Sequence, residues 1–206
     1  RHLSLRKRLG LELYRRLHRE AVERHELRTL FWECTLRCNL ACRHCGSDCR
    51  TDPGVKDMPA EDFLRVLDEE VTPHVDPAGV LVILSGGEVL VRDDLERIGS
   101  EIARRGYPWG MVTNGLALTP ERLHGLIRAG LRTISVSLDG FEREHNRIRR
   151  NPASFARAMD AVRHIVREPE LAFDVVTCVT EPLVPQLEAF RDRLVAEGVR
   201  HWRLFS

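Results

Sequence analysis

Three cysteines in one short stretch have the spacing of a metal-binding loop. Five of the six cysteines lie between positions 34 and 49, in the sequence CTLRCNLACRHCGSDC. Within it, Cys38, Cys42 and Cys45 form the only C-x3-C-x2-C triple. Cysteine thiolates are the usual ligands of iron–sulfur clusters. Three thiolates on a four-iron cluster leave one iron open, and an open iron permits chemistry that a purely electron-carrying site does not need.

Two other interpretations of the triple are a disulfide framework and a structural zinc site. Disulfides are disfavoured because no secretory signal is visible and cytosolic thiols stay reduced. A zinc site would want four Cys or His ligands, typically in two separated pairs, and no second pair exists. A binding or electron-transfer module with a plain metal centre is the competing hypothesis from another functional class.

The composition is that of an ordinary soluble protein with one sizeable core. The chain has 206 residues, of which 43% are hydrophobic and 31% charged. Its net charge of +1 gives no case for a nucleic-acid partner. No apolar run approaches a membrane span and the N-terminus lacks a signal-peptide core, so we expect no membrane partner and a cytoplasmic location. Because the chain opens on Arg1 and stops in a predicted strand, we expect a fragment of a longer protein.

Strands and helices are predicted to alternate with short loops after residue 28. We expect strands at 29–35, 80–85, 110–113, 133–138, 172–179 and 201–205. Helices are expected from Pro59 to about residue 70, at 93–105, after the Thr119 N-cap, from a Ser154 N-cap to about residue 167, and at 185–197. This alternation predicts βαβ units and a parallel sheet, which fits either a barrel or a doubly wound fold.

Residues 1–28 predict a separate, basic N-terminal extension. Leu9, Leu13 and Leu17 have helical spacing within an arginine-rich segment. The segment is either an arm that docks a substrate or partner, or a solvated helix packed on the outside of the core.

Polar motifs follow four successive predicted strands, where chemistry gathers in parallel α/β folds. The first strand ends in the cysteines, and the next three end in Ser85-Gly86-Gly87-Glu88, Thr113-Asn114-Gly115 and Ser137-Leu138-Asp139-Gly140. Two adjacent glycines let the backbone approach a ligand closely. Side chains two apart on a strand point the same way, so Ser137 and Asp139 are expected to face one side. Asn-Gly and Asp-Gly are also ordinary turn pairs.

The stretch TLRCNLACRHC resembles the cluster loop of radical S-adenosylmethionine (SAM) enzymes, including a ring residue, His44, before the third cysteine. The resemblance implies a [4Fe–4S] cluster on Cys38, Cys42 and Cys45, with SAM chelating the fourth iron. It also implies an α/β fold in which residues 29–206 form a partial (β/α)6 TIM-like barrel. His44 would belong to the cofactor site.

The same resemblance assigns cofactor-binding roles to the strand ends. Gly86, Gly87 and Glu88 look like the family's GGE(P) motif, with Val89 where proline is usual. Exposed carbonyls and Glu88 would accept from the ammonium group of SAM. The resemblance further places Thr113, Asn114, Ser137 and Asp139 in the SAM pocket.

An arginine is expected to hold the SAM carboxylate. Arg149 closes a stretch similar to the H-D-x-x-R pattern of these enzymes, with Asn146 in place of the aspartate. A guanidinium can bind a carboxylate through two parallel hydrogen bonds. Arg147 and Arg150 are near rivals for the role.

Three cysteines lie outside the triple. Cys34 is expected to be a small buried residue of the first strand. Cys49 is a candidate competing ligand or a thiol near the site, and Cys178 a candidate hydrogen-atom donor facing the barrel interior. For both, a structural role is the alternative.

The resemblance implies reductive cleavage of SAM to a 5′-deoxyadenosyl radical that abstracts a hydrogen atom from substrate. The run from the cluster loop through SLDG is most similar to the branch with a SPASM or twitch domain. That branch suggests a ribosomally made peptide as substrate, or alternatively a small-molecule cofactor precursor. The electron donor would be a flavodoxin or ferredoxin. A conventional SAM-dependent methyltransferase leaves the cysteine triple unexplained.

Overall fold

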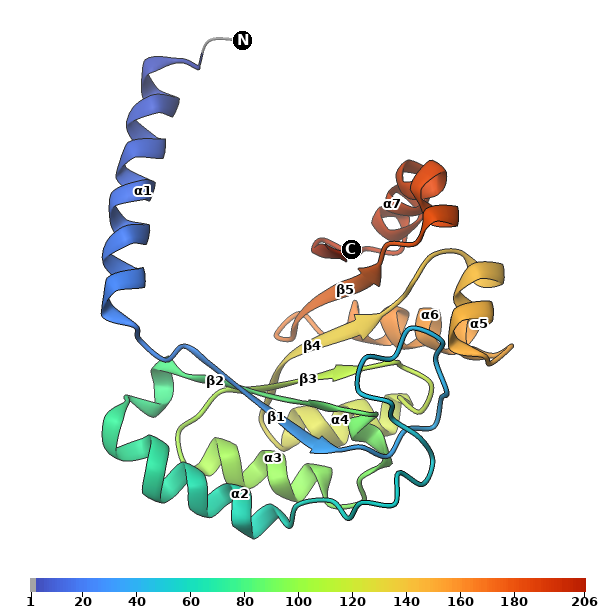
Figure 1. Ribbon diagram of the computed structural model, residues 1–206, viewed down its shortest axis with the longest axis horizontal. Coiled ribbons are helices and arrows are strands. Elements are labelled where there is room, and N and C mark those ends of the chain that lie inside the picture. The colour runs from blue at the N-terminus through green and yellow to red at the C-terminus, as the bar shows by residue number, and fades with distance from the viewer. Residues whose placement is uncertain (1–2) are drawn as a thin grey trace.

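The computed structural model describes residues 3–206, which form an α/β fold with one long helix extending from it (Figure 1). Six strands are present: β1 (Thr29–Thr35), β2 (Leu81–Gly86), β3 (Trp109–Thr113), β4 (Leu131–Ser137), β5 (Ala172–Cys178) and β6 (Trp202–Phe205). The α-helices are α1 (Leu5–Arg24), α2 (Ala60–Val66), α3 (Leu95–Arg104), α4 (Pro120–Arg128), α5 (Glu142–Arg149), α6 (Ser154–Ile165) and α7 (Leu187–Ala196). The predicted strands and helices therefore recur with shifted ends, and α5 is an additional helix that the sequence did not predict.

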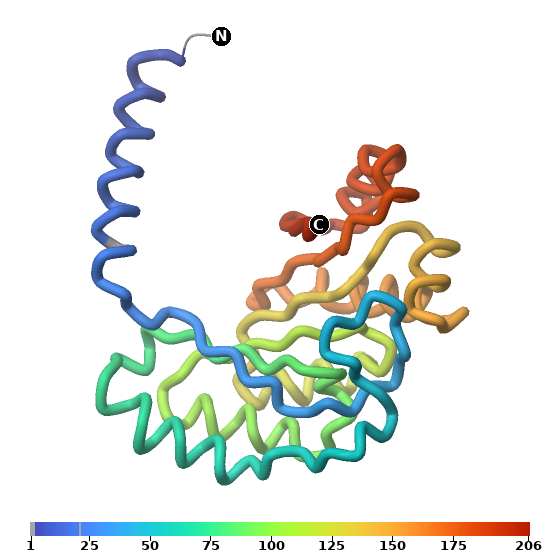
Figure 2. The backbone as a smooth tube through the Cα atoms, viewed as in Figure 1, coloured from blue at the N-terminus to red at the C-terminus, as the bar shows by residue number. Residues whose placement is uncertain are grey.

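The strand order distinguishes a barrel from a doubly wound sheet. All five neighbouring pairs are parallel, and the order is β1-β2-β3-β4-β5-β6. A doubly wound sheet would reverse its order and place helices on both faces. A sequential order with right-handed crossovers instead leaves the connecting helices on one face. Figure 2 shows the chain winding in this single direction, so the sheet is an open, partial (β/α)6 barrel.

The main core lies between the sheet and its covering helices. Burial alternates along β1, where Trp32 and Cys34 are buried and Phe31 and Glu33 are exposed. The ring of Trp32 stacks on Phe63 of α2, with centroids 3.9 Å apart. The opposite face of the sheet, on which Phe31 lies, is the inner wall of the half-barrel.

One predicted helix cap is confirmed and the other is wrong. The Thr119 side chain accepts a hydrogen bond from the amide of Arg122 at the start of α4. Ser154 lies inside the first turn of α6 instead of capping it, and its hydroxyl is bonded to a buried histidine. The side chain of Asn146 accepts from the Phe155 amide in its place.

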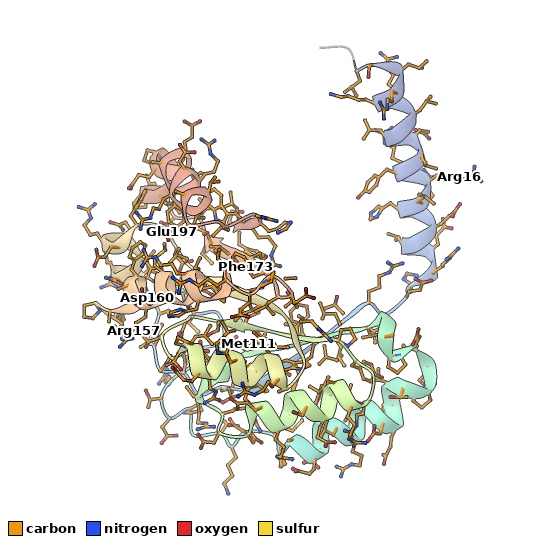
Figure 3. All side chains as sticks on the ribbon, turned by 180° about the vertical axis from the view of Figure 1, so that it is seen from behind. Arg16, Met111, Arg157, Asp160, Phe173 and Glu197 are labelled. Atoms are coloured by element: carbon orange, nitrogen blue, oxygen red, sulfur yellow. The ribbon has the colours of Figure 1, made fainter. Side chains whose placement is uncertain are left out.

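Helix α1 stands apart from the barrel. Its described leucines are exposed, among them Leu9 at 64%, Leu13 at 60% and Leu17 at 56%. Figure 3 shows Arg16 on this helix, separated from the rest of the molecule. The expected helix is therefore present, but it does not pack on the outside of the barrel.

Candidate active site

The cysteine loop leaves the end of β1 and returns to its own base. The amide of Cys38 donates to the carbonyl of Arg50 at 2.8 Å, and the Arg50 amide donates to Leu36 at 3.3 Å. Further along, the amide of Arg43 donates to the carbonyl of Ile148 on α5 at 2.8 Å. These bonds hold the loop between the ends of β1 and α5, beside the carboxyl end of the sheet.

The three cysteines of the triple differ in exposure. Cys38 is buried, Cys42 half-buried and Cys45 exposed. The sulfur of Cys38 accepts from the Leu40 amide at 3.4 Å, and that of Cys45 from the Cys49 amide at 3.5 Å. Burial raises the pKa of Cys38 to about 11, so binding a cation there requires a proton to leave. Amide donors aimed at sulfur suit thiolate ligands, which carry negative charge.

The glycine turn after β2 packs against the base of the cysteine loop. Gly86 has a φ of +124°, and a Cβ there would lie 2.2 Å from the Thr35 carbonyl oxygen. A Cβ on Gly87 would lie 2.2 Å from the carbonyl oxygen of Arg37. The amides of Gly87 and Glu88 donate to these two carbonyls at 2.7 and 2.9 Å. These two amides are therefore engaged within the protein, and the glycines allow close contact between the end of β2 and the start of the cysteine loop.

Glu88, which was expected to accept from the ammonium group of SAM, is bonded within the protein in this structure. Its side chain is completely buried. One carboxylate oxygen accepts from the Thr113 hydroxyl at 2.6 Å and the Leu90 amide at 3.2 Å, and the other from the Asn114 amide at 2.7 Å. Burial raises the pKa of Glu88, and the three donors oppose that rise. Glu88 therefore fixes the end of β3 against the end of β2.

Asp139, at the end of β4, is the centre of a buried polar cluster. One of its oxygens accepts from Arg149 Nε at 2.9 Å, and lies 2.8 Å from Arg149 Nη2 and 3.3 Å from His44 Nε2. The other accepts from the Cys178 amide at 3.0 Å. Burial alone would raise the pKa of Asp139, but the hydrogen bond from His44 and the charge of Arg149 hold it well below its usual range. Asp139 is thus a carboxylate that joins the cysteine loop, α5 and β5.

A buried histidine that the sequence did not single out supports this cluster. His145 Nδ1 accepts from the Asp139 amide at 3.0 Å, and Nε2 lies 3.0 Å from the Ser154 hydroxyl. Burial lowers the pKa of His145 to about 3, so the ring is neutral. Because Nδ1 accepts, the proton is on Nε2 and is donated to Ser154. His145 is the histidine of the stretch similar to H-D-x-x-R that ends at Arg149, and this motif was the signal in the sequence that could have indicated its role.

The remaining predicted residues occupy different surroundings. Ser135 and Val176 line the inner wall, so the alternation of a strand puts Ser137 and Cys178 on the same wall. Cys34 is buried in the core, as predicted. Cys49 is also buried, and burial raises the pKa of its thiol to about 12.

The inner wall lines a groove of about 1070 Å³. Its surface is largely apolar, with contributions from Phe31, Ile83 and Val112. A polar group interrupts it, where Arg203 pairs with Asp174 and donates to the Ser135 hydroxyl at 2.9 Å. A groove of this size and character can hold a large organic molecule or a peptide segment.

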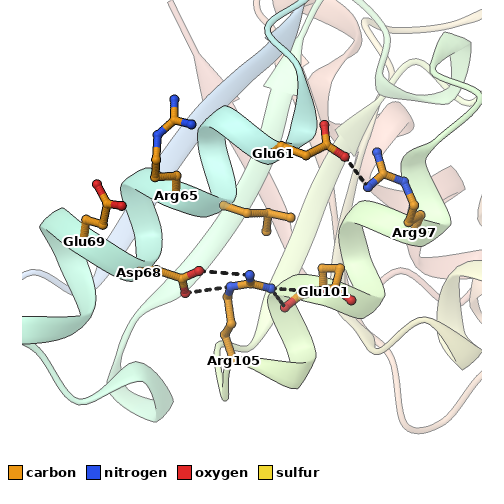
Figure 4. Close-up of a pocket in the computed structure, with 8 residues that line it drawn as sticks. Glu61, Arg65, Asp68, Glu69, Arg97, Glu101 and Arg105 are labelled. Atoms are coloured by element: carbon orange, nitrogen blue, oxygen red, sulfur yellow. Dashed lines mark hydrogen bonds and ion pairs between the residues drawn. The ribbon is translucent and has the colours of Figure 1, made fainter.

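A smaller pocket of about 370 Å³ lies between α2 and α3, on the outer, helical layer (Figure 4). Several of its charged side chains form ion pairs with one another. Arg105 binds Asp68 at 2.8 Å and Glu101 at 2.7 Å, while Arg97 binds Glu61 at 2.8 Å. The pocket lies away from the strand ends, and its ion pairs stabilise the contact between the two helices.

One group of metal-binding side chains lies close together beside the cysteine loop. Among the residues described, one group of three side chains has all its possible metal-binding atoms within 4.8 Å of one another. These are His44, Asp139 and Cys178. The three cysteines of the triple do not meet that limit. In this group the Asp139 carboxylate is already paired with the guanidinium of Arg149, whose positive charge disfavours the binding of a metal cation.

Comparison with known proteins agrees with this geometry. Residues 32–180 match the radical SAM superfamily. The chain is 34% identical over 159 residues to the AdoMet-dependent heme synthase of Methanosarcina barkeri, covering 75% of this chain and 43% of that protein. It is 30% identical over 162 residues to the mycofactocin maturase MftC of Mycobacterium tuberculosis, covering 78% and 40%. The chain thus spans less than half the length of these relatives.

Solved structures share the fold. The AdoMet-bound anSMEcpe structure superposes with a TM-score of 0.72 at 16% identity, covering 87% of this chain and 50% of that one. Streptococcus suis SuiB bound to its precursor peptide SuiA gives a TM-score of 0.71 at 15% identity, covering 92% and 42%. The chain belongs to the radical SAM superfamily, a family of enzymes that use a [4Fe–4S] cluster and SAM. In the part of the chain described, no helix combines the length and apolarity needed to cross a membrane.

Proposed function

We propose that this chain is the catalytic core of a radical SAM maturase, with the cluster on Cys38, Cys42 and Cys45. The observation that carries the proposal is the convergence of this loop with the Glu88 and Asp139 networks at one edge of the sheet. When bound, the cluster and SAM supply a 5′-deoxyadenosyl radical that abstracts a hydrogen atom from substrate. The protein contributes binding, orientation and exclusion of water.

Several groups of the protein would each bind a different part of SAM. Carbonyls of the Gly86-Gly87 turn would accept from its ammonium group. Glu88 would hold this turn in position through its bonds to the end of β3. Ser137 and Asp139 suit the hydroxyl and polar groups of the cofactor, and His44 lies against Asp139 at the mouth of the site. Thr113 completes the adjoining strand end.

Arg149 is proposed to hold the SAM carboxylate while it remains paired with Asp139. A guanidinium carries five N–H donors, and Asp139 engages only its Nε and Nη2 groups. Its other donors can therefore face a second carboxylate. Arg147 is instead bonded to Glu144 at 2.9 Å and half exposed, which supports Arg149 over this rival.

We propose a ribosomally made peptide as substrate, lying along the inner-wall groove. The similarity to MftC and the fold shared with SuiB support this class. Cys178 lies at the cofactor end of the same wall, where its thiol would donate a hydrogen atom to a substrate radical. The electron donor would be a flavodoxin or ferredoxin.

A small-molecule cofactor precursor is the second candidate substrate, supported by the identity to the heme synthase. The two classes can be separated with the same protein. Binding of a precursor peptide that changes with substitutions along the groove, at Phe31 or Val112, would support the first. Competition with this peptide by a tetrapyrrole that binds at the same positions would support the second.

The test of the cofactor chemistry is anaerobic reconstitution with iron and sulfide. The reduced protein should show a [4Fe–4S] electron paramagnetic resonance (EPR) signal that changes when SAM is added, because SAM binds the open iron. A signal that does not respond to SAM would contradict the proposal and favour a fully ligated electron-transfer centre.

A further inference from the structure

Cys38 differs from the other two cysteines of the triple in having a side-chain donor. Its sulfur accepts from the Leu40 amide at 3.4 Å and lies 4.0 Å from Nδ2 of Asn114. Cys38 is 8% exposed and Asn114 5% exposed, so the contact is sheltered from water. A hydrogen bond to sulfur in such surroundings has a larger electrostatic effect than one in water.

The orientation of the Asn114 amide is determined by its other partners. Its Oδ1 accepts from the backbone amide of Leu116 at 2.9 Å, and its Nδ2 donates to Oδ1 of Asn39 at 2.8 Å. Rotating the side-chain amide by half a turn would set an NH2 group against the Leu116 N–H, which can only donate. The NH2 group therefore faces Cys38.

The backbone of Asn114 is fixed as firmly as its side chain. Its amide donates to Glu88 at 2.7 Å, and that carboxylate is completely buried. A chain of hydrogen bonds thus runs from the Glu88 carboxylate through Asn114 to the sulfur of Cys38. Asn114 was expected in the SAM pocket, and its side-chain NH2 group is directed at Cys38 and Asn39 of the cysteine loop.

We propose that Asn114 is a tuning residue whose side-chain N–H donates to the Cys38 thiolate and raises the reduction potential of the cluster. The inference rests on the proposed function, since it requires the cluster on the cysteine triple. A donor to sulfur withdraws electron density from the ligand and stabilises the reduced cluster, which carries more negative charge. One electron enters from the external donor and no bond to the protein is formed or broken.

The test is a redox titration of the reconstituted chain, monitored by EPR in the absence of SAM, with dithionite as reductant. Asn114→Leu removes the donor without adding charge, and Asn114→Asp replaces it with a carboxylate of the same shape. We expect a more negative midpoint potential in both. The reduction constant should fall by about threefold for the leucine variant and about tenfold for the aspartate variant, the latter equal to about 59 mV for one electron.

Asn151→Asp is the matched control, because it makes the same chemical change at the turn after α5. Its Oδ1 accepts from the Ala153 amide, a bond that aspartate can keep. The control potential should equal that of the wild type. Wild-type potential in a fully loaded Asn114→Leu variant would overturn the tuning role, and so would loss of the cluster from both Asn114 variants, which would assign Asn114 to folding of the loop. A wild-type chain that assembles no [4Fe–4S] signal would instead contradict the proposed function.

Discussion

Asp139→Asn is expected to destabilise the folded chain strongly, because it removes one half of a buried ion pair. The Asp139 side chain is 1% exposed and that of Arg149 9% exposed, and two guanidinium nitrogens contact the same oxygen at 2.8 and 2.9 Å. Asparagine can still accept from the Cys178 amide, so that bond is kept. The main loss is the countercharge, and leaving a buried arginine without one costs about 3–5 kcal/mol.

The pH dependence gives this prediction a second, independent signature. The pKa of Asp139 is lower in the folded state than its ordinary value, so its contribution is fully present at neutral pH and is lost as the pH falls. The difference in the free energy of unfolding between wild type and Asp139→Asn should therefore be constant from about pH 7 to 5. It should shrink as the pH falls below about 4, where carboxyl groups in the unfolded chain take up protons.

The assay is urea unfolding of both proteins without cluster, under anaerobic reducing conditions. A double variant, Asp139→Asn with Arg149→Met, removes the stranded charge and should recover about 1–3 kcal/mol of the loss. Additive losses in the double variant, or a single-variant loss below about 1 kcal/mol, would refute the assignment of a buried, mutually dependent pair. A difference in the free energy of unfolding that grows as the pH falls would contradict a lowered pKa of Asp139 in the folded state.

Three further predictions concern the site. Gly87→Ala should lower iron incorporation at least severalfold, as measured by iron analysis after reconstitution, because its Cβ would lie 2.2 Å from the Arg37 carbonyl oxygen; normal loading would show that the turn can shift. Arg149→Lys should bind SAM about tenfold more weakly by calorimetry, a loss of about 1.4 kcal/mol, since lysine lacks the guanidinium fork; an equal loss in Arg147→Ala would transfer the role. Alanine at any one cysteine of the triple should abolish the EPR signal whereas Cys34→Ala should retain it, and the reverse pattern would contradict the ligand assignment.

Local sequence patterns were sufficient for the order of the strands and of every α-helix except α5, and for the grouping of the strand ends that form the candidate site. The first four strands end in cysteine, glycine or polar residues, and these ends meet at one edge because the strands are parallel. The cysteine triple is contiguous in sequence, so its spacing could be recognised directly. The Thr119-Pro120 start of α4 is equally local.

The hydrogen-bond and ion-pair partners of the site's residues could not be predicted in the same way. Glu88 and Asn114 are 26 residues apart, and their contact depends on how the ends of β2 and β3 align in space. Glu88 was assigned to the ammonium group of SAM because Gly86-Gly87-Glu88 resembles the family's GGE(P) motif. The structure buries it, since the glycines bring the turn against the cysteine loop and leave the carboxylate facing β3.

The buried pair of Asp139 and Arg149 also explains how the site can accept an anionic ligand. Three thiolates and Asp139 place negative charge near the position proposed for the SAM carboxylate. A lone carboxylate at Asp139 would repel it, whereas the paired guanidinium neutralises Asp139 and retains unused N–H donors. His44, 3.3 Å from the same oxygen, brings the cysteine loop to this pair. The Asp139–Arg149 pair therefore both stabilises the fold and sets the charge of the site, which is why its removal should affect unfolding and SAM binding together.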